Sequence, residues 1–349
     1  MVKTGQIASG PAVGQFEGLL QTYLGNPCVT STADVSSSIT VALFMAGVRP
    51  GDEVVTTPMT CLATTAPVRN LFAEVRWCDV DPTTGNLDPE GLERSLSSRT
   101  RAILVFHWAG NPADVDSIRA IGSSWGIPVV EDAGEALGSE YKGRKIGNSG
   151  SDYTVFSFYP NRHINTIEGG AIAFGKETDY EQGRWLKRYG IHHPSFRTAD
   201  GEIDPRSDIP VAGWNSYMNQ VAASIGVAQM RHLPSIIERH HSNGLFYDAA
   251  LAEIPGITTL KRLPQTRSAH WVYTFLSDDR TGLMARLRAE GIQASRVHIR
   301  NDIYSCFESA KQILPGVDFF DSHCLSIPCG WWLQQEDLHR IVDCIARKA

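Results

Sequence analysis

The sequence predicts an α/β protein with a largely parallel sheet covered by helices on both faces. Over the first 235 or so residues, short runs rich in β-branched residues alternate with helical patterns. Runs that are apolar along almost their whole length are typical of parallel strands buried on both sides. The chain has 349 residues, so we expect a large unit over residues 1–235 and a smaller α+β unit over residues 236–349.

Hydrophobic spacing and turn residues place the individual elements. The expected helices cover residues 16–24, 39–46, 113–125 and 236–251, and the second of them ends at a Gly47 signal. The expected strands cover residues 53–57, 75–80, 102–106, 128–131, 153–158 and 171–174. Ligands of such sheets bind beyond the carboxyl ends of the strands, so the polar residues that follow each strand are the first candidates for a site.

Charge and hydropathy exclude several classes of function. The chain carries 32 Lys and Arg against 38 Asp and Glu, a net charge of −6, which argues against nucleic acid as a partner. The longest apolar stretches, such as residues 39–48, are too short to span a membrane, and the N-terminal residues lack the apolar core of a secretory signal. We therefore expect a cytoplasmic protein that acts on a small molecule.

Cysteine and histidine give no signal for a metal site. The seven cysteines are dispersed without a CxxC pair, which is typical of reduced thiols. The adjacent pairs His192–His193 and His240–His241 lack the spacing of paired ligands on one helix face. We expect no metal ion, and loop or surface positions for these histidines.

Two strand ends carry the residues of greatest chemical interest. The strand over 128–131 leads into Asp132, and a carboxylate at the tip of a buried strand is costly unless a cation meets it. The alternative for Asp132 alone is a helix N-cap. The strand over 153–158 contains Ser157 and is followed by NRHINTIEGG, which brings a hydroxyl, two basic residues and two glycines together.

Five segments occur in an order that carries a resemblance. They are GVRPGDEVVTTPMTCLATTAP, CDVDPTTGNLDPEGLERSLSSRTRAILVFHWAGNPADVDSI, EDAGEALGSEYKGRKIG, the SFYPNRHINTIEGG run, and GWNSYMNQVAASIGVAQM. Together they resemble the sugar aminotransferase family typified by DegT and StrS. That resemblance covers nearly the whole chain and implies the fold-type-I architecture of pyridoxal-phosphate (PLP) enzymes.

The resemblance implies a cofactor site that two subunits share. Asp132 would pair with the pyridine nitrogen and keep the ring an electron sink. Ser157 would hold the cofactor phosphate, together with the backbone of Val35 and Ser36 at a helix start. Asn215 would reach the same phosphate from a partner subunit, which implies a homodimer.

Several positions depart from the family pattern. Glu135 stands where the family commonly has Gln near the cofactor hydroxyl, and Leu62 stands where an aromatic side chain often stacks on the ring. Asp34 lies in the phosphate loop and would place a negative charge near the phosphate unless it points away. Tyr217 replaces an arginine that often follows the interface asparagine.

The largest departure is the missing Schiff-base lysine. The family places it two residues after the proline of the Ser-Phe-Tyr-Pro motif, and here that residue is Arg162. Arginine has a pKa above about 12, so it neither forms an imine readily nor acts as a base near neutral pH. We therefore expect PLP, or pyridoxamine phosphate (PMP), to be bound noncovalently.

Three interpretations remain open at this stage. The protein resembles the family's sugar dehydratases, which work without an internal aldimine, and His163 would then be the base. It could instead be an atypical transaminase in which His163 or another lysine moves protons, although Lys142 and Lys145 fit a solvated turn better. The third alternative is a catalytically silent homologue with a binding or scaffolding role, in which Arg162 contacts a phosphate.

The substrate is expected to be a keto sugar, by default nucleotide-linked, or a sugar-like antibiotic precursor. The resemblance places residues 297–302 on a small-domain strand that faces the active site. His298 and Arg300 could therefore contact the sugar or its phosphate. For Arg300, an ion pair with Asp302 or another acid is an equal alternative.

Overall fold

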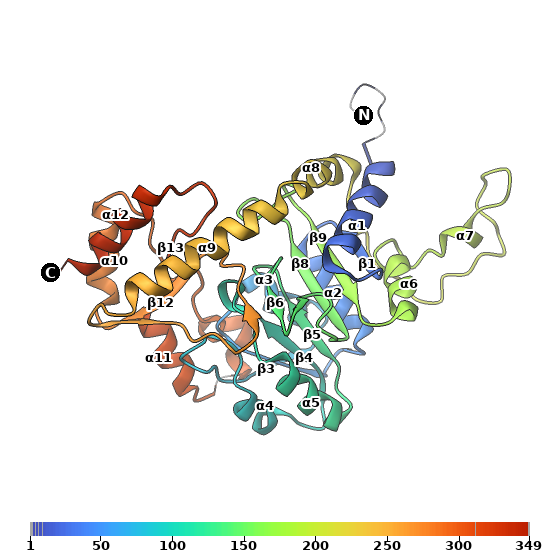
Figure 1. The fold of residues 1–349 in the computed structure, drawn as a ribbon. Helices are drawn as coiled ribbons and strands as arrows, with labels where there is room; N and C mark the ends of the chain where they lie inside the picture. The colour runs from blue at the N-terminus through green and yellow to red at the C-terminus, as the bar shows by residue number, and fades with distance from the viewer. Residues whose placement is uncertain (1–2, 4, 6, 9, 311, 348–349) are drawn as a thin grey trace.

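The computed structural model describes residues 3, 5, 7–8, 10–310 and 312–347. Its centre is a seven-stranded sheet in the order β1-β9-β8-β5-β4-β2-β3 (Figure 1). The strands are β1 (Val29–Thr32), β2 (Glu53–Thr56), β3 (Glu74–Trp77), β4 (Thr100–Phe106), β5 (Val129–Asp132), β8 (Tyr153–Ser157) and β9 (Gly170–Phe174). The pairs from β3 to β8 are parallel, and β9 is antiparallel to both of its neighbours. The mostly parallel α/β sheet is therefore confirmed.

Successive residues of the strands pack into different layers, as the apolar runs predict. Val54 lies in the core formed with helix α2, whereas Val55 lies in the core formed with α4 and α5. Helices α1 and α8 cover the β8–β9 part of the sheet on the face opposite α2. The helices of this unit are α1 (Pro11–Leu24), α2 (Val35–Met45), α3 (Leu62–Asn70), α4 (Pro89–Ser95), α5 (Val115–Trp125), α6 (Glu177–Leu186), α7 (His193–Phe196) and α8 (Gln220–Met230).

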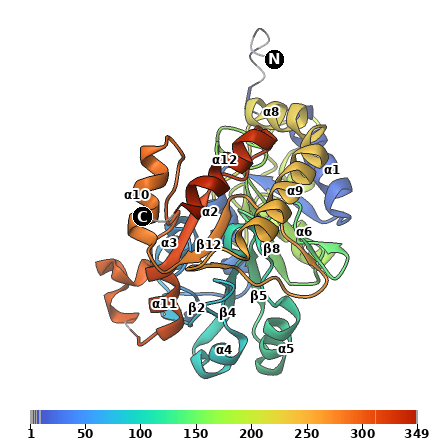
Figure 2. The same ribbon diagram turned by 60° about the vertical axis from the view of Figure 1, so that its left-hand side comes forward.

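A second, smaller unit has its own antiparallel sheet and core. Its strands β10 (Ile257–Thr259), β12 (Tyr273–Ser277) and β13 (Cys324–Ile327) pair in that order. Figure 2 shows α10 (Arg280–Ala289) and α12 (Gln335–Ala346) beside this sheet, and their apolar residues share its core. Helix α11 (Pro315–His323) precedes β13, and the short turns η3 (Asn301–Ile303) and η4 (Ser305–Ala310) precede α11.

Helix α9 (Leu233–Leu251) joins the two units. Leu233 and Ile237 belong to the core of the large unit, whereas Tyr247 and Leu251 belong to the core of the small one. The expected boundary between residues 235 and 236 therefore falls inside this helix. Beyond α9, strand β11 (Thr266–Arg267) returns to pair with β6 (Glu140–Tyr141), which pairs in turn with β7 (Arg144–Lys145).

Two expectations about local structure are wrong. Residues 297–302 do not form a strand, because Val297 has a φ of 63°, which interrupts an extended backbone, and η3 begins at Asn301. His240 is not a surface residue, since it is 3% exposed on the inner side of α9.

All seven cysteines are free thiols. In the described part of the chain, no helix is long and apolar enough to cross a membrane.

Candidate active site

A cavity of about 800 Å³ lies at the carboxyl end of the large sheet, where the small unit meets it. Its walls come from the turn before α3, the loop after β8, the residues just before β12 and the segments around residues 291–298 and 326–332. Cys61, Arg162, Trp271, His298 and Trp332 are among the side chains that line it. This is the position at which ligands of such sheets are expected.

Asp132 ends β5 as a buried carboxylate held by neutral donors. Its Oδ2 accepts a hydrogen bond of 2.6 Å from the Thr64 hydroxyl, and its Oδ1 accepts one of 2.9 Å from the backbone N–H of Gly134. Burial raises the pKa of Asp132, and the charge of Glu135 adds to that rise. A cationic ligand group would relieve the cost of this buried charge.

Gly134 keeps the space beside Asp132 open. A methyl group on its Cα would lie 3.0 Å from Asp132 Oδ1 and 3.3 Å from Ser157 Cβ, with Val35 Cγ2 at 4.0 Å. The same point therefore brings together three residues that the sequence assigns to one cofactor. A buried carboxylate with neutral partners, beside a gap lined by a hydroxyl residue and a helix start, fits a ring that carries a protonated nitrogen and a phosphate.

The start of α2 forms the second part of this cradle. Asp34 caps the helix: its Oδ1 accepts from the Ser37 N–H at 2.7 Å and its Oδ2 from the Ser37 hydroxyl at 2.8 Å. The N–H groups of Val35 and Ser36, in the first turn of the helix, are left for a ligand. Both oxygens of the Asp34 carboxylate are thus directed at Ser37, although the negative charge remains at the start of the helix.

Arg162 is fixed by contacts on two sides. Its guanidinium carbon lies 4.2 Å from the centre of the Trp271 ring, and its Nη1 lies 3.7 Å from Glu135 Oε1. Its Nε is buried and has no hydrogen-bond partner among the described residues. The loop after β8 thus presents a fixed guanidinium at the place where the sequence motif predicts a lysine.

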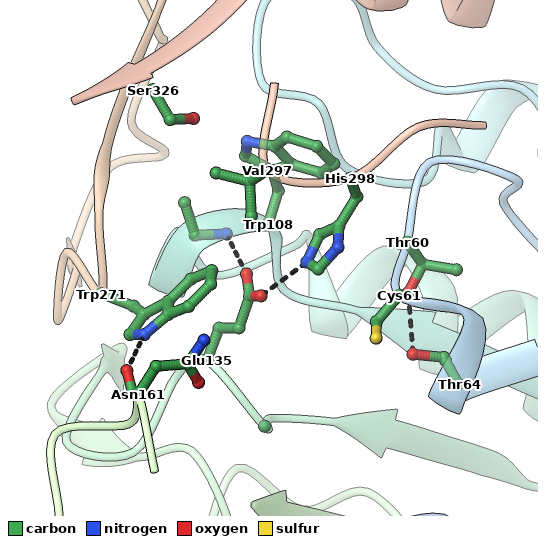
Figure 3. Close-up of polar contacts among 12 residues, drawn as sticks. Thr60, Cys61, Thr64, Trp108, Glu135, Asn161, Trp271, Val297, His298 and Ser326 are labelled. Atoms are coloured by element: carbon green, nitrogen blue, oxygen red, sulfur yellow. Dashed lines mark hydrogen bonds and ion pairs between the residues drawn. The ribbon is translucent and has the colours of Figure 1, made fainter. Parts of the chain in front are cut away.

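Glu135 connects Arg162 to the small unit. Its carboxylate is 1% exposed, accepts a hydrogen bond of 2.9 Å from the Ala109 N–H and lies 2.7 Å from His298 Nε2. Figure 3 shows this carboxylate pointing toward His298, with Trp271 on its other side. The His298 ring stacks on Trp271, with centroids 6.3 Å apart and an angle of 16° between the planes.

The comparisons agree with this geometry. The model of the DegT/DnrJ/EryC1/StrS aminotransferase family matches residues 1–346. The chain belongs to this family. The sugar aminotransferase CalS13 from Micromonospora echinospora is 33% identical, with a TM-score of 0.93 over 99% of this chain and 94% of that one. AtS13 from Actinomadura melliaura is 32% identical, with a TM-score of 0.91 over 99% and 93% of the two chains. An uncharacterised protein of Methanocaldococcus jannaschii is 28% identical over 99% of this chain and 92% of its own length.

The family implies a PLP or PMP cofactor, and its fold-type-I architecture is the one described above. Leu62 is the first residue of α3, and 45% of its surface is exposed. It does not line the cavity, whereas the preceding residue, Cys61, does. Asn215 is exposed and forms an isolated backbone bridge with Arg188.

Among the expected site residues, Arg162 and His298 line the cavity, whereas His163 and Arg300 do not and are held by contacts elsewhere. The His163 ring is 6% exposed, packs 4.6 Å from the His240 ring and has its Nε2 3.0 Å from the Ala269 carbonyl oxygen. Arg300 forms ion pairs with Asp302, at 2.6 Å, and with Asp318. These two acids raise the pKa of Arg300 further. Of the two alternatives for Arg300, the structure therefore shows the ion pair. Arg300 is not among the residues that line the cavity.

The sequence reasoning did not single out three residues that shape the site. Thr64 holds Asp132, Gly134 keeps the gap open, and Trp271 stacks against both Arg162 and His298. For Gly134 the signal was present, because a small residue two positions after a strand-end carboxylate permits close approach of a ligand. Thr64 and Trp271 act through contacts with distant parts of the chain, which spacing along the sequence does not reveal.

Proposed function

We propose that this family member binds PLP or PMP without a covalent bond and acts on a keto sugar, as a dehydratase or an atypical aminotransferase. The observation that carries the proposal is the combination at one site of Arg162, in the lysine position, with a retained Asp132 carboxylate and an open Gly134 gap. A nucleotide-linked keto sugar is the default substrate, and a sugar-like antibiotic precursor is the alternative.

The residues that would hold the cofactor are those of the cradle. Asp132 would hold the ring nitrogen, and Ser157 with the start of α2 would hold the phosphate. We propose that Asn215 of the partner subunit completes the phosphate site, so that the working unit is a homodimer. When bound, the cofactor supplies an electron sink for a substrate carbanion.

The chain's own residues would orient the substrate in the cavity. Arg162 presents a permanent positive charge, and the cation–π contact with Trp271 fixes the position of its guanidinium. Trp271 and Trp332 offer apolar faces on which a sugar or a base can pack. The cavity volume of about 800 Å³ suits a ligand larger than a simple sugar.

A cofactor spectrum tests the proposal. The purified protein loaded with PLP should lose the cofactor on dialysis and should give no PLP–lysine adduct after borohydride treatment. Arg162→Lys should restore such an adduct at residue 162, because the new lysine side chain would reach the same cradle. Arg288→Lys, at another arginine that lines the cavity, is the matched control and should give none. A borohydride-stable adduct in the unaltered protein would overturn the proposal.

A silent homologue with a binding role is the second candidate. It is favoured by the contacts of Arg162 with Trp271 and Glu135, which already fill part of the lysine position, and by the acidic cap at α2. Calorimetry with PMP separates the two functions. Tight PMP binding that is lost in Asp132→Ala counts against the silent homologue, whereas absence of any PMP binding counts for it.

A further inference from the structure

We infer that His298, held by Glu135, is the acid–base residue that moves protons in place of the missing lysine. This inference rests on the proposed function, because it assigns a residue to the reaction of the same site. The expected base, His163, is enclosed between His240 and the Ala269 carbonyl and does not line the cavity. Arg162 cannot give up its proton near neutral pH. A different group has to carry the proton.

The lysines that the structure describes do not provide that group. No described lysine lines the cavity. Lys142 pairs with Asp116 at 2.5 Å, and Lys145 pairs with Glu140 at 3.1 Å in the same turn. Lys187 is buried in an ion pair of 2.9 Å with Glu17 and does not line the cavity. The thiol of Cys61 does line the cavity, but burial raises its pKa above the ordinary value for a thiol.

His298 has the position that a base at this site requires. It lines the cavity, and the Glu135 carboxylate contacts both it and Arg162, since Glu135 Oε1 lies 2.7 Å from His298 Nε2 and 3.7 Å from Arg162 Nη1. Trp108 and Trp271 hold the ring from two sides, with centroids 5.8 and 6.3 Å away. The imidazole is therefore fixed beside the place where the family's lysine stands.

The contact with Glu135 selects one form of the ring. A carboxylate only accepts hydrogen bonds, so His298 Nε2 carries the proton and donates it to Glu135. Nδ1 then has a free lone pair, and it has no hydrogen-bond partner among the residues that the structure describes. A carboxylate that orients an imidazole and stabilises its protonated form is the arrangement used by general bases. Glu135 is a positioning residue, and His298 is the catalytic one.

The proton balance is simple. His298 Nδ1 would accept a proton from the methylene carbon of bound PMP, next to the nitrogen that joins it to the sugar, and the cofactor would supply the electron sink for the electron pair of that C–H bond. The resulting imidazolium is neutralised by Glu135. The imidazolium would then return the proton, either to the former keto carbon of the sugar in amino transfer or to the departing hydroxyl, which would leave as water. His298 and Glu135 end in their starting forms.

The tautomer of His298 gives a test that needs neither cofactor nor substrate. In protein labelled with ¹⁵N at histidine, NMR should show His298 protonated at Nε2 and unprotonated at Nδ1 above neutral pH. Glu135→Gln should remove this preference, because an amide can donate as well as accept. His339→Gln, at an exposed histidine of α12, is the control: any change in the His298 signals that it also produces is unrelated to the contact with Glu135. A His298 protonated at Nδ1 in the unaltered protein would overturn the inference.

Proton exchange in the loaded protein gives the second test. The probe is PMP with thymidine diphosphate 4-keto-6-deoxyglucose in heavy water, and the readout is deuterium entering the methylene group of PMP. His298→Gln should bind PMP within about twofold of the unaltered protein but exchange about 100-fold more slowly or worse. Glu135→Gln should lower the exchange rate, because the ring of His298 loses the carboxylate that orients it. His339→Gln should exchange normally.

The outcomes separate the two proposals. An unaltered protein that binds no PMP overturns the proposed function while the tautomer result stands on its own. An unaltered protein that binds PMP and exchanges, with His298→Gln exchanging at the same rate, overturns only the role of His298. Binding of PMP with no exchange in the unaltered protein counts against both.

Discussion

Asp132 is the residue at which stability and binding are opposed. Its carboxylate is buried with two neutral donors, and burial raises its pKa. A raised pKa means that the contribution of this group to stability is present at low pH and is lost as the pH rises through the folded-state value. A ligand with a protonated nitrogen would pair with the buried charge of Asp132 and offset the free energy that its burial costs. The carboxylate is therefore unfavourable for the stability of the free protein and favourable for binding such a ligand.

Asp132→Asn should therefore stabilise the free protein at pH 7 by about 1 kcal/mol, while PMP binding weakens at least tenfold. The gain should shrink as the pH falls through the raised folded-state pKa of Asp132 and should be absent below about 4, where the carboxylate is protonated in both folded and unfolded chains. Urea unfolding at pH 7 and pH 4, with calorimetry of PMP binding, measures both effects. A variant that is less stable at pH 7 would show that the Asp132 charge is already compensated in the free protein.

The residues of the site were partly predictable. Asp132 and Ser157 end strands whose positions the sequence indicates, and Arg162 follows one of them, so their common edge could be expected. The contact between Glu135 and His298 joins residues 163 positions apart in the chain, and no local pattern marks it. The burial of His163 likewise depends on α9, which covers it from a distant part of the sequence.

At the scale of the element, the start of α2 combines a helix cap with a phosphate site. Asp34 occupies the Ser37 N–H and brings a negative charge to the positive end of the helix. The cap favours the free protein, whereas a bound phosphate would be repelled by the same charge. The two roles can be separated, because an asparagine caps a helix about as well as an aspartate.

Asp34→Asn should keep the stability of the protein and raise its affinity for PMP several-fold. Asp34→Ala should lower the free energy of unfolding by about 1 kcal/mol, since it removes the cap. Urea unfolding and PMP calorimetry on both variants measure these effects. If Asp34→Asn binds PMP more weakly, the phosphate does not lie at this helix start.

The elements themselves were predicted better where apolar runs are long. The six strands and four helices expected from hydrophobic spacing all form, with ends that differ by a few residues. Strand β1 was missed because its sequence VTST has no apolar run, although all four residues are buried. The expected strand over 297–302 failed at Val297, whose left-handed backbone no propensity of valine would suggest.

At the scale of the whole molecule, the proposed homodimer predicts complementation. If Asn215 serves the partner's site, a mixed dimer of Asp132→Asn and Asn215→Asp chains has one site with both defects and one site with none. Equal mixing after unfolding and refolding should restore PMP binding in about a quarter of the sites. Recovery of no binding in mixtures that contain the mixed dimer would place Asn215 in the site of its own chain.

The junction of the two units predicts a loss of stability in mild acid. His163 and His240 contact each other between the loop after β8 and α9, and each bonds a backbone carbonyl of the segment at residues 269–270. Burial lowers the pKa of both rings and of His270 next to them, and nearby cations lower those of His163 and His270 further. These rings stay neutral in the folded protein at a pH where the unfolded chain takes up protons.

Their contribution to stability is therefore present above about pH 6.5 and is lost as the pH falls below that value. Each histidine adds at most about 1.4 kcal/mol per pH unit to the slope. Urea unfolding between pH 7.5 and 5 should show this slope, and His163→Gln, which can still donate to the Ala269 carbonyl, should lower it by about one histidine's share. The exposed His339→Gln should leave the slope unchanged. An unaltered slope in His163→Gln would mean that this ring is protonated in the folded protein and that the junction tolerates its charge.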